Sequence, residues 1–315
     1  MSTHNITLFG GSSLPDVTEA VSIQLNVPLE RSISSKFSDG EIRIELMKAV
    51  RGSDAYIIQS TCNPVNDTLM ELILMTDALK RASVNTVTAI IPYFGYSRQD
   101  RRPSESRVPI SARVVADLMQ SAGIDHIITV DIHSLQIEGF FKIPVDNISA
   151  TNLFAVDIYK QYGDQVDNLI IVSPDVGGVA RARAIAKELG DLDLAIVDKR
   201  RPKANVSEVM NIIGDVEGKI CIIIDDMVDT ASTLCKAADA LIEVGGAKKV
   251  IAYATHGVLS GNASDNIHNS RLSELVITDS IPAHGNIYKV RYLSLASIIA
   301  HTINNITQNK SILSY

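Results

Sequence analysis

The sequence contains little cysteine: three residues among 315, Cys62, Cys221 and Cys235. They form no C-x-x-C spacing, so neither a disulfide framework nor a zinc site is indicated. No apolar run approaches the roughly 18 residues of a membrane-spanning helix. The start, MSTHNITLFGGSS, also lacks the basic and long apolar segments of a secretory signal peptide. We therefore expect a cytoplasmic protein in a reducing compartment, with no membrane partner.

Positive charge is scarce as well, since 29 Lys and Arg face 36 Asp and Glu and give a formal net charge of −7. Proteins that bind nucleic acids carry a basic excess that neutralises phosphates, so we expect no nucleic-acid partner. Any anionic ligand must instead meet a local basic cluster. The composition, 46% hydrophobic and 21% charged, is that of an ordinary globular protein and excludes collagenous and disordered classes.

Short β-rich runs alternate with helical patterns along the whole chain. Helices are predicted at residues 66–83, 110–122, 178–189 and 232–244. Strands that alternate with helices predict an α/β fold, with mainly parallel sheets flanked by helices.

The length exceeds one typical domain of about 150 residues, so we predict two tandem domains, residues 1–148 and 149–315. The boundary lies in PVDNISATN, where Thr151 is expected to cap a helix. The last ~25 residues could pack on the N-terminal domain.

The stretch CIIIDDMVDTAST, residues 221–233, joins a buried strand to a hydroxyl-rich turn that opens a helix. Backbone N–H groups and the hydroxyls of Thr230, Ser232 and Thr233 could wrap a phosphate there. Asp225 and Asp226 could accept hydrogen bonds from vicinal sugar hydroxyls or bind Mg²⁺. A purely structural interpretation remains open, in which Asp229 or Ser232 caps the helix and the other acids are solvated.

Two further stretches concentrate charge. DKRRPKAN places four cations within residues 199–205, where they could stabilise charge on a transferring phosphoryl group or simply form a solvated loop. SRQDRR, residues 97–102, could grip phosphate through arginine or form a subunit contact. His133 and Asp175 each follow a predicted strand, where a structural role is the simpler interpretation.

CIIIDDMVDTAST resembles the phosphoribosyl pyrophosphate (PRPP) loop of type I phosphoribosyltransferase-like proteins, in which an apolar strand precedes acid-acid-x-x-Asp-Thr-x-x-Thr. Six more stretches, in order, are similar to the ribose-phosphate diphosphokinase (PRPP synthetase) family: SKFSDGEIRIEL, VRGSDAYIIQST, IPYFGYSRQDRR, TVDIHSLQIEGFF, VSPDVGGVARARAIAK and DKRRPKANVSEVMNIIGDV. The resemblance implies two tandem phosphoribosyltransferase-like domains. It also implies Mg²⁺-dependent transfer of the diphosphoryl group of ATP to ribose 5-phosphate, with AMP as the other product, feeding nucleotide, histidine, tryptophan and NAD biosynthesis.

The resemblance assigns roles to residues of this chain. The catalytic residues would be Lys199, Arg201 and Arg98. Ribose 5-phosphate would be bound by Arg201, Asp225, Asp226, Asp229, Thr230, Ala231, Ser232 and Thr233. ATP would be bound by Phe37, Asp39, Gly40, Glu41, Arg98, Gln99 and Asp100. His133 and Asp175 would hold Mg²⁺. The hairpin around Phe37 would reach the ATP site of a neighbouring subunit, which implies a homo-oligomer, a hexamer.

Three features depart from the family pattern. Many relatives have Gly where this chain has Ala231 or Ser232, Lys142 replaces an acidic residue, and the tail reads NKSILSY. The last two lie near regions that the family uses for regulation by ADP and phosphate. Two alternatives are a phosphoribosyltransferase that consumes PRPP and a noncatalytic regulatory subunit; FSDGE and SRQDRR favour the synthetase over the first, and intact KRRP, His133 and Asp175 over the second.

Overall fold

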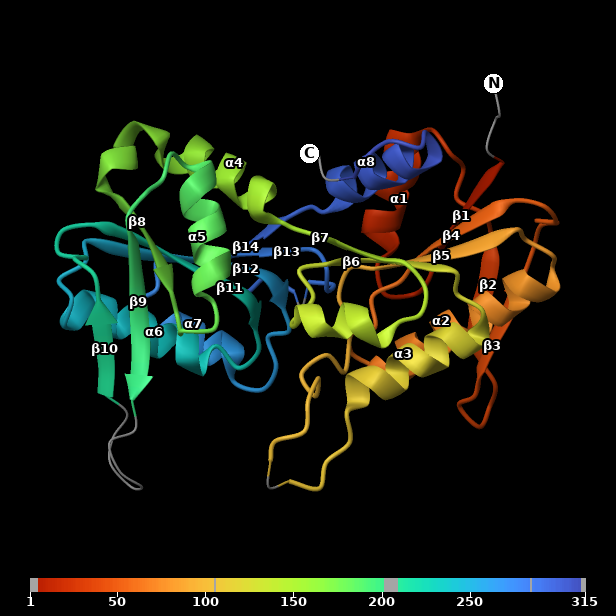
Figure 1. Ribbon diagram of the computed structural model, residues 1–315, viewed down its shortest axis with the longest axis horizontal. Coiled ribbons are helices and arrows are strands. Elements are labelled where there is room, and N and C mark those ends of the chain that lie inside the picture. The colour runs from red at the N-terminus through yellow and green to blue at the C-terminus, as the bar shows by residue number, and fades with distance from the viewer. Residues whose placement is uncertain (1–4, 105, 201–208, 284, 313–315) are drawn as a thin grey trace. The chain divides into compact units, whose positions relative to one another are not determined.

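The computed structural model describes residues 5–104, 106–200, 209–283 and 285–312. The chain forms two compact units (Figure 1). Unit 1 contains the chain up to Ile148, the short segment Ser280–Pro282, and the C-terminal segment from Ser294. Unit 2 contains Ser149–Asp279 and Ala283–Leu293. The predicted α/β architecture is confirmed, because each unit is built on a mainly parallel sheet with helices on both faces.

The sheet of unit 1 has the order β1-β4-β5-β6-β7, and all its neighbouring strands are parallel. Its strands are β1 (Ile6–Gly10), β4 (Asp54–Ile58), β5 (Thr86–Ile91), β6 (His126–Val130) and β7 (Val145–Ile148). One face carries α1 (Pro15–Leu25) and α8 (Ala296–Thr307), which pack on each other, and the other carries α2 (Val65–Arg81) and α3 (Ser111–Ala122). Parallel strands covered on both faces require continuous apolar runs, and the interior strands β4 and β5 provide them.

Two smaller elements complete unit 1. The antiparallel hairpin of β2 (Ser32–Lys36) and β3 (Ile42–Leu46) packs against α2 through β3. A 3₁₀ helix, η1 (Leu135–Phe140), follows β6.

The sheet of unit 2 has the order β10-β9-β8-β11-β12-β13-β14. Its strands are β8 (Leu169–Ser173), β9 (Leu194–Arg200), β10 (Val209–Ile213), β11 (Ile220–Val228), β12 (Lys249–Gly257), β13 (Glu274–Thr278) and β14 (Val290–Leu293). Only the β9–β10 pair at one edge is antiparallel. One face carries α4 (Thr151–Tyr162), the 3₁₀ helix η2 (Gly163–Asn168) and α5 (Val179–Glu188), and the other carries α6 (Ser232–Glu243) and α7 (Ala263–Asn269).

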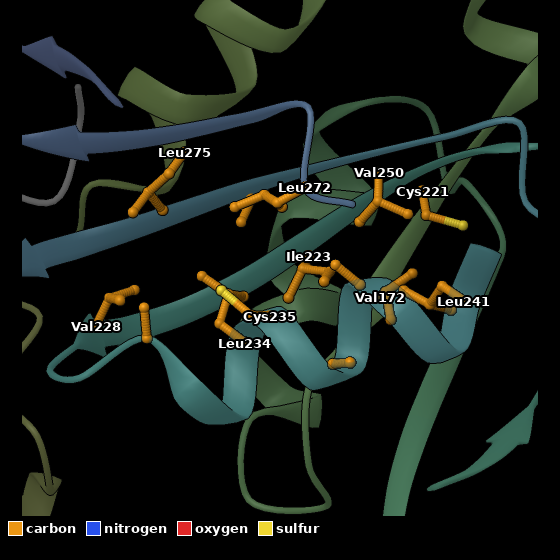
Figure 2. Packing of buried hydrophobic residues seen from close by; sticks show 14 of the residues in the cluster. Val172, Cys221, Ile223, Val228, Leu234, Cys235, Leu241, Val250, Leu272 and Leu275 are labelled. Atoms are coloured by element: carbon orange, nitrogen blue, oxygen red, sulfur yellow. The ribbon is translucent and has the colours of Figure 1, made fainter. Parts of the chain in front are cut away.

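Helix α6 is fixed to the sheet by its apolar face. Figure 2 shows Leu234 and Leu241 of α6 packed toward Ile223 of β11. Leu241 and Ile223 are fully buried, and burial of such a side chain stabilises a fold by about 1.5–3 kcal/mol. This packing holds the first turn of α6 at the carboxyl end of β11, where ligands bind in open α/β sheets.

The four predicted helices are confirmed to within two residues, as α2, α3, α5 and α6. The predicted Thr151 cap is wrong, because Thr151 is the first residue of α4 and Ala150 occupies the cap position. Ser149 supplies the capping oxygen, which accepts the Thr151 N–H at 3.2 Å. Among the helices that the structure describes, none has the length and apolar character needed to cross a bilayer.

Candidate active site

The acids at the end of β11 lie together in a partly enclosed position. β8 pairs with β11 only as far as Ile223, so Asp225 and Asp226 extend past the end of that neighbouring strand. Asp226 is buried and its N–H donates to Asp225 Oδ1 at 2.8 Å. Arg181, in the first turn of α5, places Nη1 3.6 Å from Asp225 Oδ1 and 3.3 Å from Asp226 Oδ1. A single guanidinium therefore faces both carboxyl groups.

One positive charge does not fully compensate this acid pair. Burial, together with repulsion from Asp226, raises the pKa of Asp225 to about 7, although Arg181 opposes both effects. Carboxyl oxygens in this state are suited to hydroxyl donors or to a cation, since either would stabilise the charged form. The pair therefore has the chemistry to accept from hydroxyl groups or to bind a cation.

The turn that follows β11 leaves the start of α6 without a side-chain cap. Ala231 occupies the cap position in a left-handed conformation, φ 58° and ψ 0°, and its carbonyl accepts the Cys235 N–H at 2.9 Å. Neither Asp229 nor Ser232 is the cap residue, because Ala231 occupies that position and Ser232 is the first helical residue. The Asp229 carboxylate accepts from Ser260 Oγ. The first N–H groups of a helix lack intrahelical acceptors and attract anions. Residues 229–233 thus form a turn suited to phosphate.

Asp175 is at the carboxyl end of β8, in a tight turn that leads into α5. Its Oδ1 accepts the Gly178 N–H at 2.8 Å, and its carbonyl accepts from Ser173 Oγ at 2.6 Å. A Cβ at Gly178 would lie 2.9 Å from Ser173 Oγ, so this turn needs glycine. Asp175 therefore has the structural role that its sequence context suggested, and its second oxygen remains a suitable Mg²⁺ ligand in kind.

His133 lies in the loop between β6 and η1 of unit 1, whereas Asp175 belongs to unit 2. Within the described part of the chain, no three His, Cys, Asp or Glu side chains come together as a metal group. Mg²⁺ prefers oxygen ligands, so the Asp175 carboxylate is a suitable ligand in kind and the His133 imidazole is a less usual one.

Arg98, Gln99 and Asp100 follow β5 and are anchored by two other elements of unit 1. Gln99 Oε1 accepts from Ser111 Oγ of α3 at 2.5 Å, which leaves the Gln99 amide nitrogen as the donor to a ligand. Gln136 of η1 donates to Asp100 Oδ2 at 2.6 Å. Arg98 and Gln99 are exposed beside these anchors. The segment is thus held in place while its cationic and amide groups remain accessible.

The loop of the β2–β3 hairpin carries the four other predicted ATP residues, Phe37, Asp39, Gly40 and Glu41. Phe37 N–H donates to the Glu41 carbonyl at 2.8 Å, and the Asp39 carboxylate accepts the Glu41 N–H at 3.1 Å. Gly40 has φ 95°, a conformation that other residues rarely adopt. Phe37 is 53% exposed, an unusual position for a large aromatic side chain.

The cationic stretch after β9 is described only in part. Lys199 is in β9, where its backbone pairs with Met210 of β10, and its side chain lies outside the described residues. Arg201 lies outside the described residues altogether.

The sequence analysis did not identify the residues that contact the acid pair, Asp225 and Asp226, or the turn at residues 229–233. The sequence carried no signal that Arg181 faces the acid pair. Ser260 and Asn266, which hydrogen-bond the phosphate turn, are more than 30 residues from it in the chain. Their contact depends on the register of β11 against β12, which sequence periodicity does not reveal.

Two family profiles match the chain. One describes the N-terminal domain of ribose phosphate pyrophosphokinase and matches residues 6–123, and the other describes a phosphoribosyl synthetase-associated domain and matches residues 194–315. Among curated proteins, the chain is 56% identical to a ribose-phosphate pyrophosphokinase of Burkholderia pseudomallei over 318 aligned positions, covering 100% of this chain and 98% of that protein. It is 53% identical to the corresponding protein of Vibrio parahaemolyticus, with 98% of each covered. Among solved structures, phosphoribosylpyrophosphate synthetase from Mycobacterium smegmatis matches with a TM-score of 0.90 and 40% identity, over 97% of this chain and 99% of that one.

Proposed function

The chain belongs to the ribose-phosphate pyrophosphokinase family, and on that premise we propose how its residues divide the work of the reaction. The activity transfers the diphosphoryl group of ATP to the anomeric hydroxyl of ribose 5-phosphate and gives PRPP and AMP. Similarity to curated synthetases over the full length of the chain favours this activity over a phosphoribosyltransferase or a noncatalytic subunit. In this proposal the ATP residues of the hairpin and of segment 98–100 belong to unit 1, and the ribose 5-phosphate loop belongs to unit 2.

Ribose 5-phosphate binds at the end of β11. The 5-phosphate accepts N–H and hydroxyl hydrogen bonds from residues 229–233. Asp225 and Asp226 accept hydrogen bonds from the 2- and 3-hydroxyls or would bind an associated Mg²⁺ through their carboxylate oxygens. The observation that carries this assignment is the uncapped first turn of α6 next to the acid pair. The acceptors for the sugar hydroxyls, Asp225 and Asp226, thus come first in one short segment, and the donors for the 5-phosphate, residues 229–233, follow them. Ribose 5-phosphate likewise has its hydroxyls at one end and its phosphate at the other.

ATP binds through Arg98, Gln99 and Asp100 of one subunit and through Phe37, Asp39, Gly40 and Glu41 of a neighbour. The hairpin loop supports this arrangement, because Phe37 is largely exposed in its own chain and the loop has a defined internal hydrogen-bond pattern. Phe37 would pack on adenine, while Asp39 and Glu41 accept from the adenine amino group or the ribose hydroxyls. Catalysis then requires a homo-oligomer, a hexamer in this proposal.

Charge stabilisation carries the chemical step. The anomeric hydroxyl oxygen attacks the β-phosphorus of ATP in line and its proton is released to solvent. The bond from that phosphorus to the oxygen bridging to the α-phosphorus breaks, and AMP leaves with the bridging oxygen. Lys199, Arg201 and Arg98 neutralise the charge that develops on the phosphoryl oxygens. His133 and Asp175 would hold Mg²⁺, which when bound supplies further positive charge at the ATP phosphates. Positioning and charge stabilisation suffice, without a covalent enzyme intermediate.

The net charge and the cysteines of the protein support a cytoplasmic location without a nucleic-acid partner. A net charge of −7 opposes binding to nucleic acid. The three cysteines are free and buried, as expected for a protein of the reducing cytoplasm.

Substrate analogues test the ribose 5-phosphate assignment. Release of AMP is followed with ribose 5-phosphate, with 2-deoxyribose 5-phosphate and with ribose, for the wild type and for Asp225→Asn. If Asp225 accepts from the ribose 2-hydroxyl, the substitution lowers kcat/KM for ribose 5-phosphate more than for the 2-deoxy sugar. An equal loss with both sugars would remove Asp225 from recognition of the 2-hydroxyl.

A further inference from the structure

Three residues of a segment after β12 are hydrogen-bonded to the end of β11 and to the turn at residues 229–233, the phosphate turn. Leu259 N–H donates to the Val228 carbonyl at 3.1 Å, and Ser260 N–H donates to the Asp229 carbonyl at 3.1 Å. Asn266 of α7 donates from Nδ2 to the Thr230 carbonyl at 2.8 Å. Ser260 Oγ also donates to the Asp229 carboxylate. We call residues 259–266 the brace.

The brace binds three successive carbonyls, and this determines where the neighbouring N–H groups point. In a planar trans peptide the C=O and the following N–H point in opposite directions. Because Ser260 binds the Asp229 carbonyl and Asn266 binds the Thr230 carbonyl, the N–H groups of Thr230 and Ala231 point away from the brace. Successive N–H groups directed to one side form a concave anion site.

The conformation of Ala231 shows why such support is needed. Ala231 has φ 58°, and a residue with a Cβ is destabilised there relative to glycine. Without the brace, the peptide between Thr230 and Ala231 would be free to rotate toward a relaxed conformation, and its N–H would no longer face the ligand. Because this chain has Ala231 at this position, the hydrogen bonds from the brace hold a left-handed conformation that glycine would adopt without strain.

We propose that Ser260 and Asn266 are positioning residues of the ribose 5-phosphate site, which direct the N–H groups of Thr230 and Ala231 at the 5-phosphate. This inference rests on the proposed binding of ribose 5-phosphate by residues 229–233. Neither residue contacts the sugar or ATP; both act through the backbone of the phosphate turn.

Steady-state kinetics of Asn266→Ala test the proposal. Loss of one such hydrogen bond should raise KM for ribose 5-phosphate roughly three- to tenfold. The KM for ATP and kcat should change less than twofold, because the turn serves only the sugar phosphate. Asn266→Gln keeps an amide donor and should give a smaller increase. Asn269→Ala, an exposed asparagine of the same helix, is the matched control and should leave all three constants unchanged.

A second background separates positioning from simple stability. Ala231→Gly removes the strain that the brace holds in place. Asn266→Ala should therefore raise KM for ribose 5-phosphate by a smaller factor in the Ala231→Gly background than in the wild-type background. Thermal unfolding of every variant verifies that the protein is folded under the assay conditions.

Three results would overturn the proposal. An unchanged KM for ribose 5-phosphate in Asn266→Ala, or an equal rise of both KM values, would show that the brace does not act through the phosphate turn. An equal increase of the KM for ribose 5-phosphate on Asn266→Ala in the wild-type and Ala231→Gly backgrounds would exclude the role assigned to Ala231. If the wild type itself releases no AMP, both the proposed function and this inference fail. If the wild type turns over normally and Asn266→Ala behaves as the wild type, only the role of the brace is contradicted.

Discussion

Arg181 Nη1 lies 3.3 Å from Asp226 Oδ1 and 3.6 Å from Asp225 Oδ1, so one side chain of α5 balances both acids at the end of β11. Removal of this charge leaves two adjacent carboxyl groups without their nearest cation. The pKa of Asp225, already raised, would rise further and the pair would be protonated more often.

Arg181→Ala should therefore lower kcat/KM for ribose 5-phosphate about tenfold or more, since an opposite charge within about 4 Å stabilises a partly buried carboxylate by roughly 1–4 kcal/mol. Arg181→Lys should retain part of the activity, because it keeps the charge but not the fork of donors. Arg183→Ala, an exposed arginine of the same helix, is the control and should behave as the wild type. Equal kinetics for the two alanine variants would contradict a role for Arg181.

The raised pKa of Asp225 predicts a pH dependence of stability. The folded value is about 7 and the model-compound value is 3.8, so the folded state binds the proton more tightly. The stabilising contribution of this group is complete below pH 4 and is lost as the pH rises toward and through 7. Asp225→Asn does not titrate, so its free energy of unfolding relative to the wild type should increase between pH 5 and pH 8 in urea titrations. Asp191→Asn, at an exposed position, serves as the control; a pH-independent difference for Asp225→Asn would refute the shift.

Ala231→Gly should stabilise the protein, because φ 58° destabilises alanine by about 1–2 kcal/mol and the greater freedom of unfolded glycine offsets only part of this. We expect a gain of roughly 0.5–1 kcal/mol in the free energy of unfolding. Ala240→Gly, within α6, should have the opposite effect and destabilise the protein by about 1 kcal/mol. Two changes of the same sign would mean that Ala231 is not strained.

The shared ATP site predicts that two inactive variants restore each other. Phe37→Ala should raise KM for ATP while leaving the unfolding midpoint unchanged, since the ring is 53% exposed in its own chain. Lys199→Ala should sharply slow turnover. If the hairpin serves the neighbouring subunit, subunits of the two variants that are mixed and reassembled create wild-type sites, and activity returns. Reassembled mixtures that stay as inactive as their parents would place Phe37 and Lys199 in the site of one chain.

The sequence allowed the elements with strong periodicity to be predicted. α6 has Leu234, Ala238 and Leu241 on one face, and all three are buried. Short edge strands such as β10 and β14 are harder to predict, because their pairing, and not their own pattern, defines them. Thr151 failed as a cap because the helix begins one residue earlier than expected, with Thr151 as its first residue and Ala150 in the cap position.

The residues of the candidate site were likewise predictable from the sequence only where they are close together in the chain. Asp225, Asp226 and residues 229–233 are consecutive in the chain, so their proximity could be read directly. Arg181, Ser260 and Asn266 come from other elements and meet them through strand register and long side-chain reach, which local pattern does not encode. The left-handed Ala231 could not be foreseen either, because propensity alone assigns that conformation to glycine.

Transfer of an isotopic label tests the central claim most directly. The protein is incubated with Mg²⁺, ribose 5-phosphate and ATP labelled at the β-phosphate, and the products are separated. Transfer of an intact diphosphoryl group places the label in PRPP and leaves AMP unlabelled. Label retained in ADP would show transfer of a single phosphoryl group and would contradict the account.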